Sequence, residues 1–214
     1  MVKKEFDTDF RGKNALASVV VYSLSAVFIA YLSFQVKRGI ISSYTWNAVL
    51  WLIVMFCSIN AVAKNFAQDT SGKLLYQYIL HRPAQVITAK ILYSALLLQF
   101  ISGISVFFYI LFMKNPIQNI SLFAANLILV NIGLATILVF LSSISHKAAG
   151  GAGLLAILAF PVLIPVLLFG IKISYLAIEG VSLGDSLKNI TLLCSIDVLC
   201  AALVYILFPY LWKN

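Results

Sequence analysis

Six long apolar runs divide the chain, and five of them contain no charged residue. They cover residues 16–36, 46–63, 91–113, 121–144, 148–171 and 190–212. Each run is about as long as the roughly 20 residues that a helix needs to cross the hydrocarbon core of a membrane. Because 62% of the residues are hydrophobic and 10% are charged, a soluble domain could not bury this much apolar surface. The sequence therefore predicts a polytopic, all-α membrane protein with six transmembrane helices, folded as a single domain over residues 1–214.

The pattern within the runs favours helices over the strands of a membrane barrel. Barrel strands alternate apolar and polar residues, whereas these runs are apolar throughout. The first run is longer than the apolar core of a signal peptide, and no small-residue cleavage site clearly follows it. We therefore expect this run to stay in the mature chain as the first span.

Lysine and arginine residues in the predicted connections indicate the side of the membrane that each connection faces. An even number of spans places both termini on one side, and that side carries ten cations against five on the other. The ten are Lys3, Lys4, Arg11, Lys13, Lys64, Lys73, Arg82, Lys90, Lys147 and Lys213, and the five are Lys37, Arg38, Lys114, Lys172 and Lys188. Because cytoplasmic connections are enriched in Lys and Arg, we expect both termini in the cytoplasm. The net charge of +8 is thus assigned to the membrane surface, and no nucleic-acid partner is expected.

Residues 1–15 mix basic and aromatic side chains directly before the first span. These side chains include Lys3, Lys4, Phe6, Phe10 and Arg11. Such a mixture suits the membrane interface, where rings reach the acyl chains and cations meet the headgroups. The sequence predicts a basic N-terminal interfacial helix that anchors the chain to membrane lipid.

The longest predicted cytoplasmic connection, residues 64–90, carries a pattern of its own: KNFAQDTSGKLLYQYILHRPAQVITAK. Apolar residues recur in it at helical spacing, at Phe66, Leu74, Leu75, Tyr78 and Ile79. Pro83 ends the pattern. We predict a short amphipathic helix between spans two and three. It fits either of two roles, an anchor at the membrane surface or a docking surface for a cytosolic partner.

Two prolines, Pro161 and Pro165, fall within the fifth run. Each removes a backbone hydrogen-bond donor and favours a kink. The kink fits either a static bend or a hinge about which part of the bundle moves. Near the start of the same run, Gly150, Gly151 and Gly153 predict a close contact between helices.

Asp197 is the one acidic residue within a predicted span, near the outer end of the sixth. An ionised carboxylate at mid-membrane costs about 2.5 to 3.5 kcal/mol on insertion scales, so the group should face the bundle or water, or be neutral. Asn126 and Asn131 in the fourth run are candidates for interhelical hydrogen bonds. We expect these three residues to form an intramembrane polar site. Within it, Asp197 either accepts a hydrogen bond from one of the asparagines or a loop lysine, or takes part in transport.

Motifs for catalysis, for a metal or for a resident haem are missing from the sequence. The two histidines, His81 and His146, fall in predicted cytoplasmic connections, and no C-x-x-C or C-x-x-C-H motif occurs. Cys57, Cys194 and Cys200 lie in the spans, where a thiol acts as a small apolar group. No G-x-x-x-x-G-K-[ST] phosphate loop and no catalytic motif is present. We expect no enzyme activity, and any ATP-driven work needs a partner that binds ATP.

Three stretches carry a more specific pattern. Residues 68–83 place Asp69 before a Gly, a Leu-rich segment and Pro83; Ala89 and Lys90 precede the third run; and residues 150–170 read GGAGLLAILAFPVLIPVLLFG. In these stretches the chain resembles the ABC-2 type of transporter permease, and within it the cytochrome c maturation protein B (CcmB) family of haem exporter permeases. Two glycines followed by two prolines four residues apart are the most distinctive feature. Residues 68–83 depart from the family pattern in holding a single acidic residue.

The resemblance implies a permease of the bacterial inner membrane that pairs with a separate cytosolic ABC ATPase, with two copies of each. It also implies haem as the transported species, ATP bound by the partner only, and other cytochrome c maturation membrane proteins and a periplasmic haem chaperone as further partners. The implied ATPase-coupling segment is residues 64–90, with Asp69, Lys73, Tyr76, Tyr78 and Arg82 as candidate contacts. Two alternatives stay open: an ABC-2 permease that exports a lipid, polysaccharide or drug, and a non-transporting cytochrome assembly factor.

Overall fold

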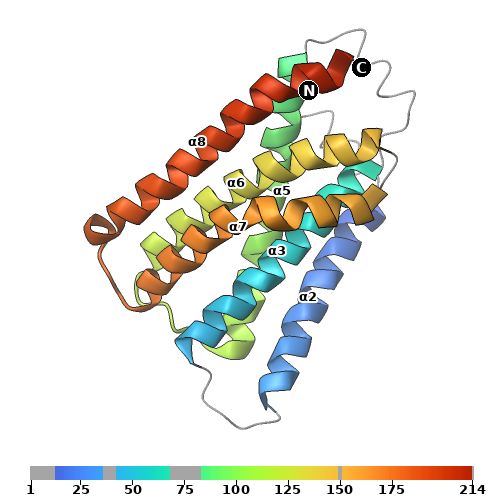
Figure 1. Ribbon diagram of the computed structural model, residues 1–214. Helices are drawn as coiled ribbons and strands as arrows, with labels where there is room; N and C mark the ends of the chain where they lie inside the picture. The colour runs from blue at the N-terminus through green and yellow to red at the C-terminus, as the bar shows by residue number, and fades with distance from the viewer. Residues whose placement is uncertain (1–12, 36–41, 68–82, 149–150, 214) are drawn as a thin grey trace.

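The computed structural model describes residues 13–35, 42–67, 83–148 and 151–213, and these residues are helical apart from short connections (Figure 1). The helices are α2 (Lys13–Gln35), α3 (Ser43–Ala67), α5 (Pro83–Met113), α6 (Ile120–Lys147), α7 (Gly151–Ile178) and α8 (Leu183–Lys213). In the described part of the chain, these six helices are long and apolar enough to cross a membrane. The predicted all-α, multi-pass architecture is therefore confirmed.

Successive helices run in opposite directions, so α2 begins and α8 ends at the same end of the bundle (Figure 1). We call this end the inner end, because the lysine and arginine count predicts that it faces the cytoplasm. The opposite end, with the turns at 114–119 and 179–182, is called the outer end.

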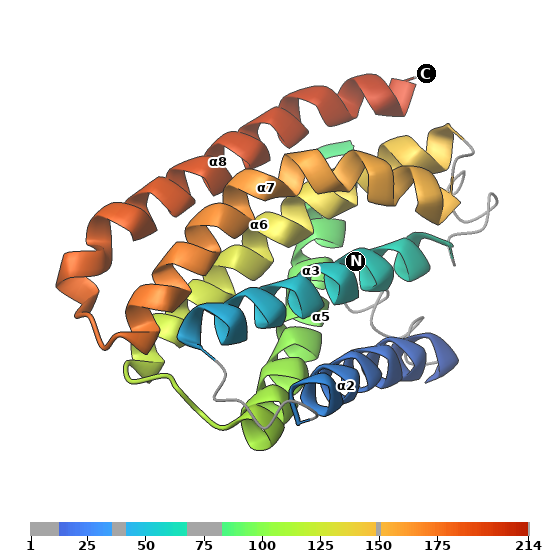
Figure 2. The same ribbon diagram turned by 60° about the horizontal axis from the view of Figure 1, so that its bottom comes forward.

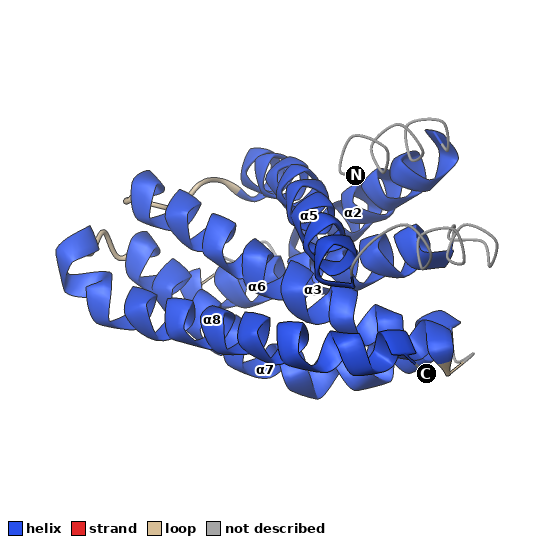
Figure 3. Ribbon diagram, turned by 90° about the horizontal axis from the view of Figure 1, so that it is seen from above, coloured by secondary structure: helices blue, strands red, loops and turns tan. Residues whose placement is uncertain are grey.

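Helices α3 and α6 form the centre of the bundle, because 67% of the apolar span of each is buried within the chain. Only 17% of the spans of α2 and α8 is buried, and these two helices lie at opposite edges (Figures 2 and 3). The exposed side chains of the edge helices are large and apolar, as in Val21 and Ile29 of α2 and Leu199 and Ile206 of α8. Such surfaces suit contact with lipid.

Asn119 joins the two outer turns into one unit. Its Oδ1 accepts a hydrogen bond from the Leu122 backbone N–H at 3.1 Å and so caps α6. Its backbone N–H donates to the Ala177 carbonyl and its Nδ2 donates to the Val181 carbonyl, both at 2.9 Å. Gly180 allows the tight turn between α7 and α8, because its φ of +76° is strained for other residues.

Several helices extend beyond the runs that predicted them. Helix α5 begins at Pro83, α7 continues to Ile178 and α8 begins at Leu183. The predicted starts and ends were wrong here because Lys90, Lys172 and Lys188 interrupted the apolar runs. A lysine can continue a membrane helix when its aliphatic stem packs on the helix and its ammonium reaches a polar region. Pro83 also lies at the first position of a helix, where its missing N–H costs nothing.

Two predicted elements lie outside the described residues. The N-terminal interfacial helix was expected over 1–15, of which 1–12 are not described. The amphipathic helix between the second and third spans falls within 68–82, which are not described either. Both elements stay predictions.

Candidate functional site

The candidate ATPase contacts Asp69, Lys73, Tyr76, Tyr78 and Arg82 all fall within the residues that the structure leaves undescribed. The helix ends on either side of them are described, since α3 ends at Ala67 and α5 begins at Pro83. Any movement of the segment between these ends must therefore act first on α3 and α5.

The inner ends of α3 and α5 are each tied to an edge helix. Lys64 Nζ donates to Ser18 Oγ at 2.6 Å, which joins α3 to α2. The hydroxyl groups of Thr88 and Tyr205 lie 2.6 Å apart and join α5 to α8. Because the Thr88 hydroxyl already donates to the Ala84 carbonyl, the Tyr205 hydroxyl is the donor in this second bond. The two helices that flank the predicted coupling segment are thus linked to both edges of the bundle.

Two buried asparagines bind successive backbone carbonyls near the outer end of α7. Asn126 of α6 donates from Nδ2 to the Gly170 carbonyl, and Asn47 of α3 donates from Nδ2 to the Ile171 carbonyl, both at 2.8 Å. The Cβ of any other residue at Gly170 would lie 2.7 Å from Val130 Cγ2. The absence of a side chain at Gly170 therefore lets α6 and α7 approach closely enough for the Asn126 bond.

Further contacts hold α3 to its neighbours in the same outer half. The Tyr109 hydroxyl of α5 donates to the Trp46 carbonyl at 3.0 Å, and the two rings meet edge to face with centroids 4.9 Å apart. Tyr44 stacks on Tyr175 of α7, with ring centroids 4.3 Å apart. Among the described residues, several interhelical hydrogen bonds of the outer half thus end on buried backbone carbonyls. In the inner half, the bonds of Lys64 and Thr88 join more exposed side chains.

Asn131 lies near the middle of the bundle and connects α6 to α5. Its Nδ2 donates to Gln99 Oε1 at 2.9 Å and to Ser102 Oγ at 2.6 Å. Together with the bond from Asn126 to Gly170, this contact confirms that both asparagines make interhelical hydrogen bonds. Their partners, Gln99, Ser102 and the Gly170 carbonyl, could not be predicted from the apolar runs.

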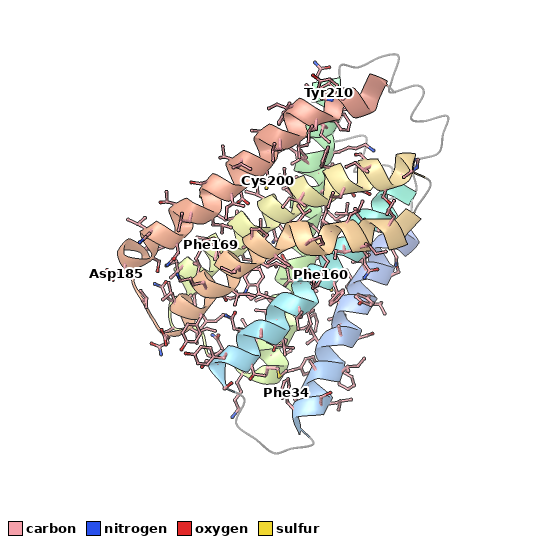
Figure 4. The ribbon with its side chains drawn as sticks, viewed as in Figure 1. Phe34, Phe160, Phe169, Asp185, Cys200 and Tyr210 are labelled. Atoms are coloured by element: carbon pink, nitrogen blue, oxygen red, sulfur yellow. The ribbon has the colours of Figure 1, made fainter. Side chains whose placement is uncertain are left out.

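Asp197 has a different environment from the one predicted. It lies near the middle of α8, one turn before Cys200, which Figure 4 places between Asp185 and Tyr210 at the two ends of the helix. Its side chain is 9% exposed, and neither carboxylate oxygen has a hydrogen-bond partner among the described residues. Of the two predicted alternatives, the one in which Asp197 bonds to Asn126, Asn131 or a loop lysine is wrong. The reason is geometric: both asparagines face α5 or α7, whereas Asp197 packs against Gly133 on another part of α6. A part in transport stays a prediction.

Pro161 and Pro165 lie within α7, which stays helical from Gly151 to Ile178. Both prolines are exposed at the surface of the chain, and α7 changes direction near its middle (Figures 1 and 2). The carbonyls of Ile157 and Pro161 lack their usual helical donors, because proline has no N–H four residues later. The two predicted roles of this bend, a static bend and a hinge, both stay predictions.

The glycines at the start of α7 do not match their predicted role where the structure describes their surroundings. A Cβ at Gly153 would have no atom within 4 Å, so this residue makes no close contact within the chain. Gly150 lies outside the described residues. The close approaches occur instead at Gly133 and Gly170.

Ligand groups for a metal or a resident haem do not gather in the described residues. No cluster of three or more His, Cys, Asp or Glu side chains occurs among them. His146 is exposed in the last turn of α6, and Cys57, Cys194 and Cys200 are free thiols on α3 and α8. The described part of the bundle is thus built from apolar side chains and a few interhelical polar contacts.

Comparison with known protein families gives a match over residues 1–210, to a family model described as CcmB protein. No curated protein and no solved structure matches the chain.

Proposed function

Because the chain belongs to the CcmB family, we propose that it is the permease subunit of an ABC transporter that exports or delivers haem for c-type cytochrome biogenesis. The family is one of haem exporter permeases and not of enzymes. The match over residues 1–210 is the observation that carries the proposal, and six apolar helices supply the membrane domain that a permease needs. We place the chain in the bacterial inner membrane with both termini in the cytoplasm, where two copies assemble with two ATPase subunits.

The proposed energy source is a cytosolic ATPase that docks on residues 64–90. The sequence holds no phosphate loop, so ATP must be bound by that partner. A movement of the docked segment would pull on α3 and α5 and reach the edge helices through Lys64–Ser18 and Thr88–Tyr205. In this scheme the chain works as a relay between ATP hydrolysis and the membrane.

We expect the inner half of the bundle to move more than the outer half. The outer half of α7 is bound to α3 and α6 through Asn47 and Asn126. The inner half lies beyond Pro161 and Pro165, where two helical hydrogen bonds are missing. This arrangement supports a hinge between the two prolines, about which the inner part of α7 follows the ATPase.

A second candidate function is that of a non-transporting assembly factor within the same system. The sequence contains only His81 and His146, and neither lies within a predicted apolar run. If haem needs histidine ligands during transfer, partner membrane proteins must supply them. The chain would then transmit ATP hydrolysis to proteins that handle haem themselves. An exporter of a lipid, polysaccharide or drug is the third reading, and it predicts that c-type cytochromes form without this chain.

Co-purification tests the ATPase-dependent part of the proposal. The tagged chain, extracted from its own membrane in mild detergent, should retain an ATP-binding subunit. Replacing Lys73 and Tyr76 together by alanine should release that subunit, because both side chains lie on the predicted docking helix. Lys188→Ala at the exposed outer end is the matched control and should not affect retention. Absence of any ATPase from the native complex would refute the relay. If the double variant still retained the ATPase, the docking surface would not include Lys73 and Tyr76.

A further inference from the structure

Asp197 and Gly133 form a close-fitting contact between α8 and α6. A Cβ at Gly133 would collide with Asp197 Oδ1, so only glycine leaves room for the carboxyl group at this position. The same Cβ would lie 3.1 Å from Val166 Cγ1 of α7, so an apolar side chain also borders this contact. The carboxyl group therefore sits in a socket made by α6 and α7, and we call this contact the Asp197 socket.

Among the described residues, nothing in the Asp197 socket would stabilise an ionised carboxylate. Both oxygens are buried and have no donor among the described residues. The sequences of α6 and α7 hold basic residue types only at His146 and Lys147, at the inner end of α6, and at Lys172, near the outer end of α7. Lys172 lies about 9 Å beyond Val166 along the helix at the usual rise per residue. On α5, which packs on the inner part of α8, the charged residue is Lys90, two residues from Thr88 of the Thr88–Tyr205 contact and distant from mid-helix.

A proton is the ligand that fits this site. A metal ion would need further donor groups, and the described residues hold no cluster of three or more His, Cys, Asp or Glu. Protonation removes the charge that makes burial of a carboxylate costly in a membrane. On α8 itself, the neighbouring titratable groups are Cys194 and Cys200, one turn away on either side.

Helix α8 is an edge helix that packs on α6, α7 and α5. Only 17% of its apolar span is buried, and at the inner end the Tyr205 hydroxyl donates a hydrogen bond to Thr88 of α5. The outer end is connected through the turn that Asn119 holds. Between these two points, Asp197 meets α6 at Gly133, in a stretch of α8 where Leu193 and Val204 are also buried.

We propose that Asp197 is a proton-binding site that controls the packing of α8 on α6. With the carboxyl group neutral, the middle of α8 packs on α6 at Gly133. When the proton is released to water, the middle of α8 separates from α6. The packed state of α8 binds the proton and the separated state does not, so a rise in pH favours the separated state. This inference rests on the Asp197 socket and not on the proposed transport function.

Cysteine labelling tests the inference with a native reporter. Cys194 lies one turn from Asp197, and the full-length chain would carry it as the single cysteine after Cys57→Ala and Cys200→Ala. Reconstituted in lipid, this protein is labelled with a small water-soluble maleimide over a range of pH, with Asp197 intact or replaced by Asn. Dividing the labelling rate with Asp197 intact by the rate of the Asp197→Asn variant cancels the pH dependence that the thiol has in both proteins. We expect the ratio to rise with pH by up to about tenfold per pH unit, the slope for one proton. A ratio that stays flat over the range would overturn the proposal.

Two further variants separate the Asp197 socket from a general loosening of the fold. Gly133→Ala should raise labelling of Cys194 at every pH, because the added methyl group collides with the carboxyl group. Adding Asp197→Ala to that variant should restore slow labelling, since the methyl group then fills the vacated space. Unchanged labelling in Gly133→Ala would contradict the socket. A protein with Cys57 as its single cysteine reports on folding, because this buried residue of α3 should stay unlabelled in every background.

Discussion

Gly170 shows how one residue sets the distance between two helices. It lies where α7 meets Val130 of α6 and Trp51 of α3, and its carbonyl accepts the bond from Asn126. Val130 is β-branched and has few alternative rotamers, so it cannot easily move away from an added side chain. The interhelical hydrogen bond and the missing side chain are therefore parts of one contact.

We predict that Gly170→Ala lowers the stability of the detergent-solubilised protein by about 1–3 kcal/mol, the usual range for overpacking a well-filled site. Thermal unfolding, followed by helical circular dichroism, measures the effect. Gly103→Ala on α5 is the matched control, because a Cβ there would have nothing within 4 Å. That control should gain about 0.5–1 kcal/mol from the better helix propensity of alanine. Equal effects of the two substitutions would contradict the close contact at Gly170.

The sequence could identify the polar residues of the spans but not their partners. Asn126 and Asn131 were predicted to bond between helices, because an amide within an apolar run needs a partner. The position of Asp197 could not be predicted for two reasons. The apolar run began after Lys188, whereas α8 begins at Leu183, so Asp197 lies nearer the middle of the helix than expected. Apolar composition also does not determine which face of a helix meets its neighbours. The close contact at Gly133 could not be predicted either, because a single glycine in an apolar run does not show which residue of another helix lies against it. Trp46 and Tyr109 were missed for the same reason, because their contact joins distant parts of the sequence.

At the scale of single elements, α7 differs from the other described helices in carrying two prolines one turn apart near its middle. Apolar runs predicted that this helix and the other spans exist, because hydrophobic length is a property of composition. They predicted the ends less well, because lysines can lie within a helix that continues beyond the hydrocarbon layer. The function of the bend depends on whether the two halves of α7 move relative to each other, which composition does not determine.

For α7 we predict that replacing Pro161 and Pro165 together by alanine preserves the amount of protein in the membrane but strongly reduces the yield of c-type cytochromes. Alanine restores both helical donors and stiffens the junction between the bound outer half and the inner half. Haem staining, normalised to the amount of the tagged chain, measures the outcome. Pro209→Ala in α8 is the matched control, because it removes a proline from another helix near its inner end. Full activity of the double variant would show that the bend is static.

Across the bundle, the antiparallel order of the helices and the count of Lys and Arg predict one orientation in the membrane. We expect a phosphatase reporter, which folds only outside the cytoplasm, to be active when inserted in the turn at 179–182 and inactive when fused after Asn214. A fluorescent reporter that folds only in the cytoplasm should give the opposite pattern. Activity of the phosphatase at the C-terminus would reverse the assignment of the inner and outer ends.

We propose that this CcmB family member serves c-type cytochrome biogenesis as an ATP-driven permease subunit. The most direct test is deletion of its gene in the native host, followed by haem staining of membranes for c-type cytochromes with b-type cytochromes as the internal control. We predict selective loss of the c-type signal, restored by the intact chain supplied in trans. If both signals survive the deletion, haem delivery is not the function of this chain and another exported substrate must be sought.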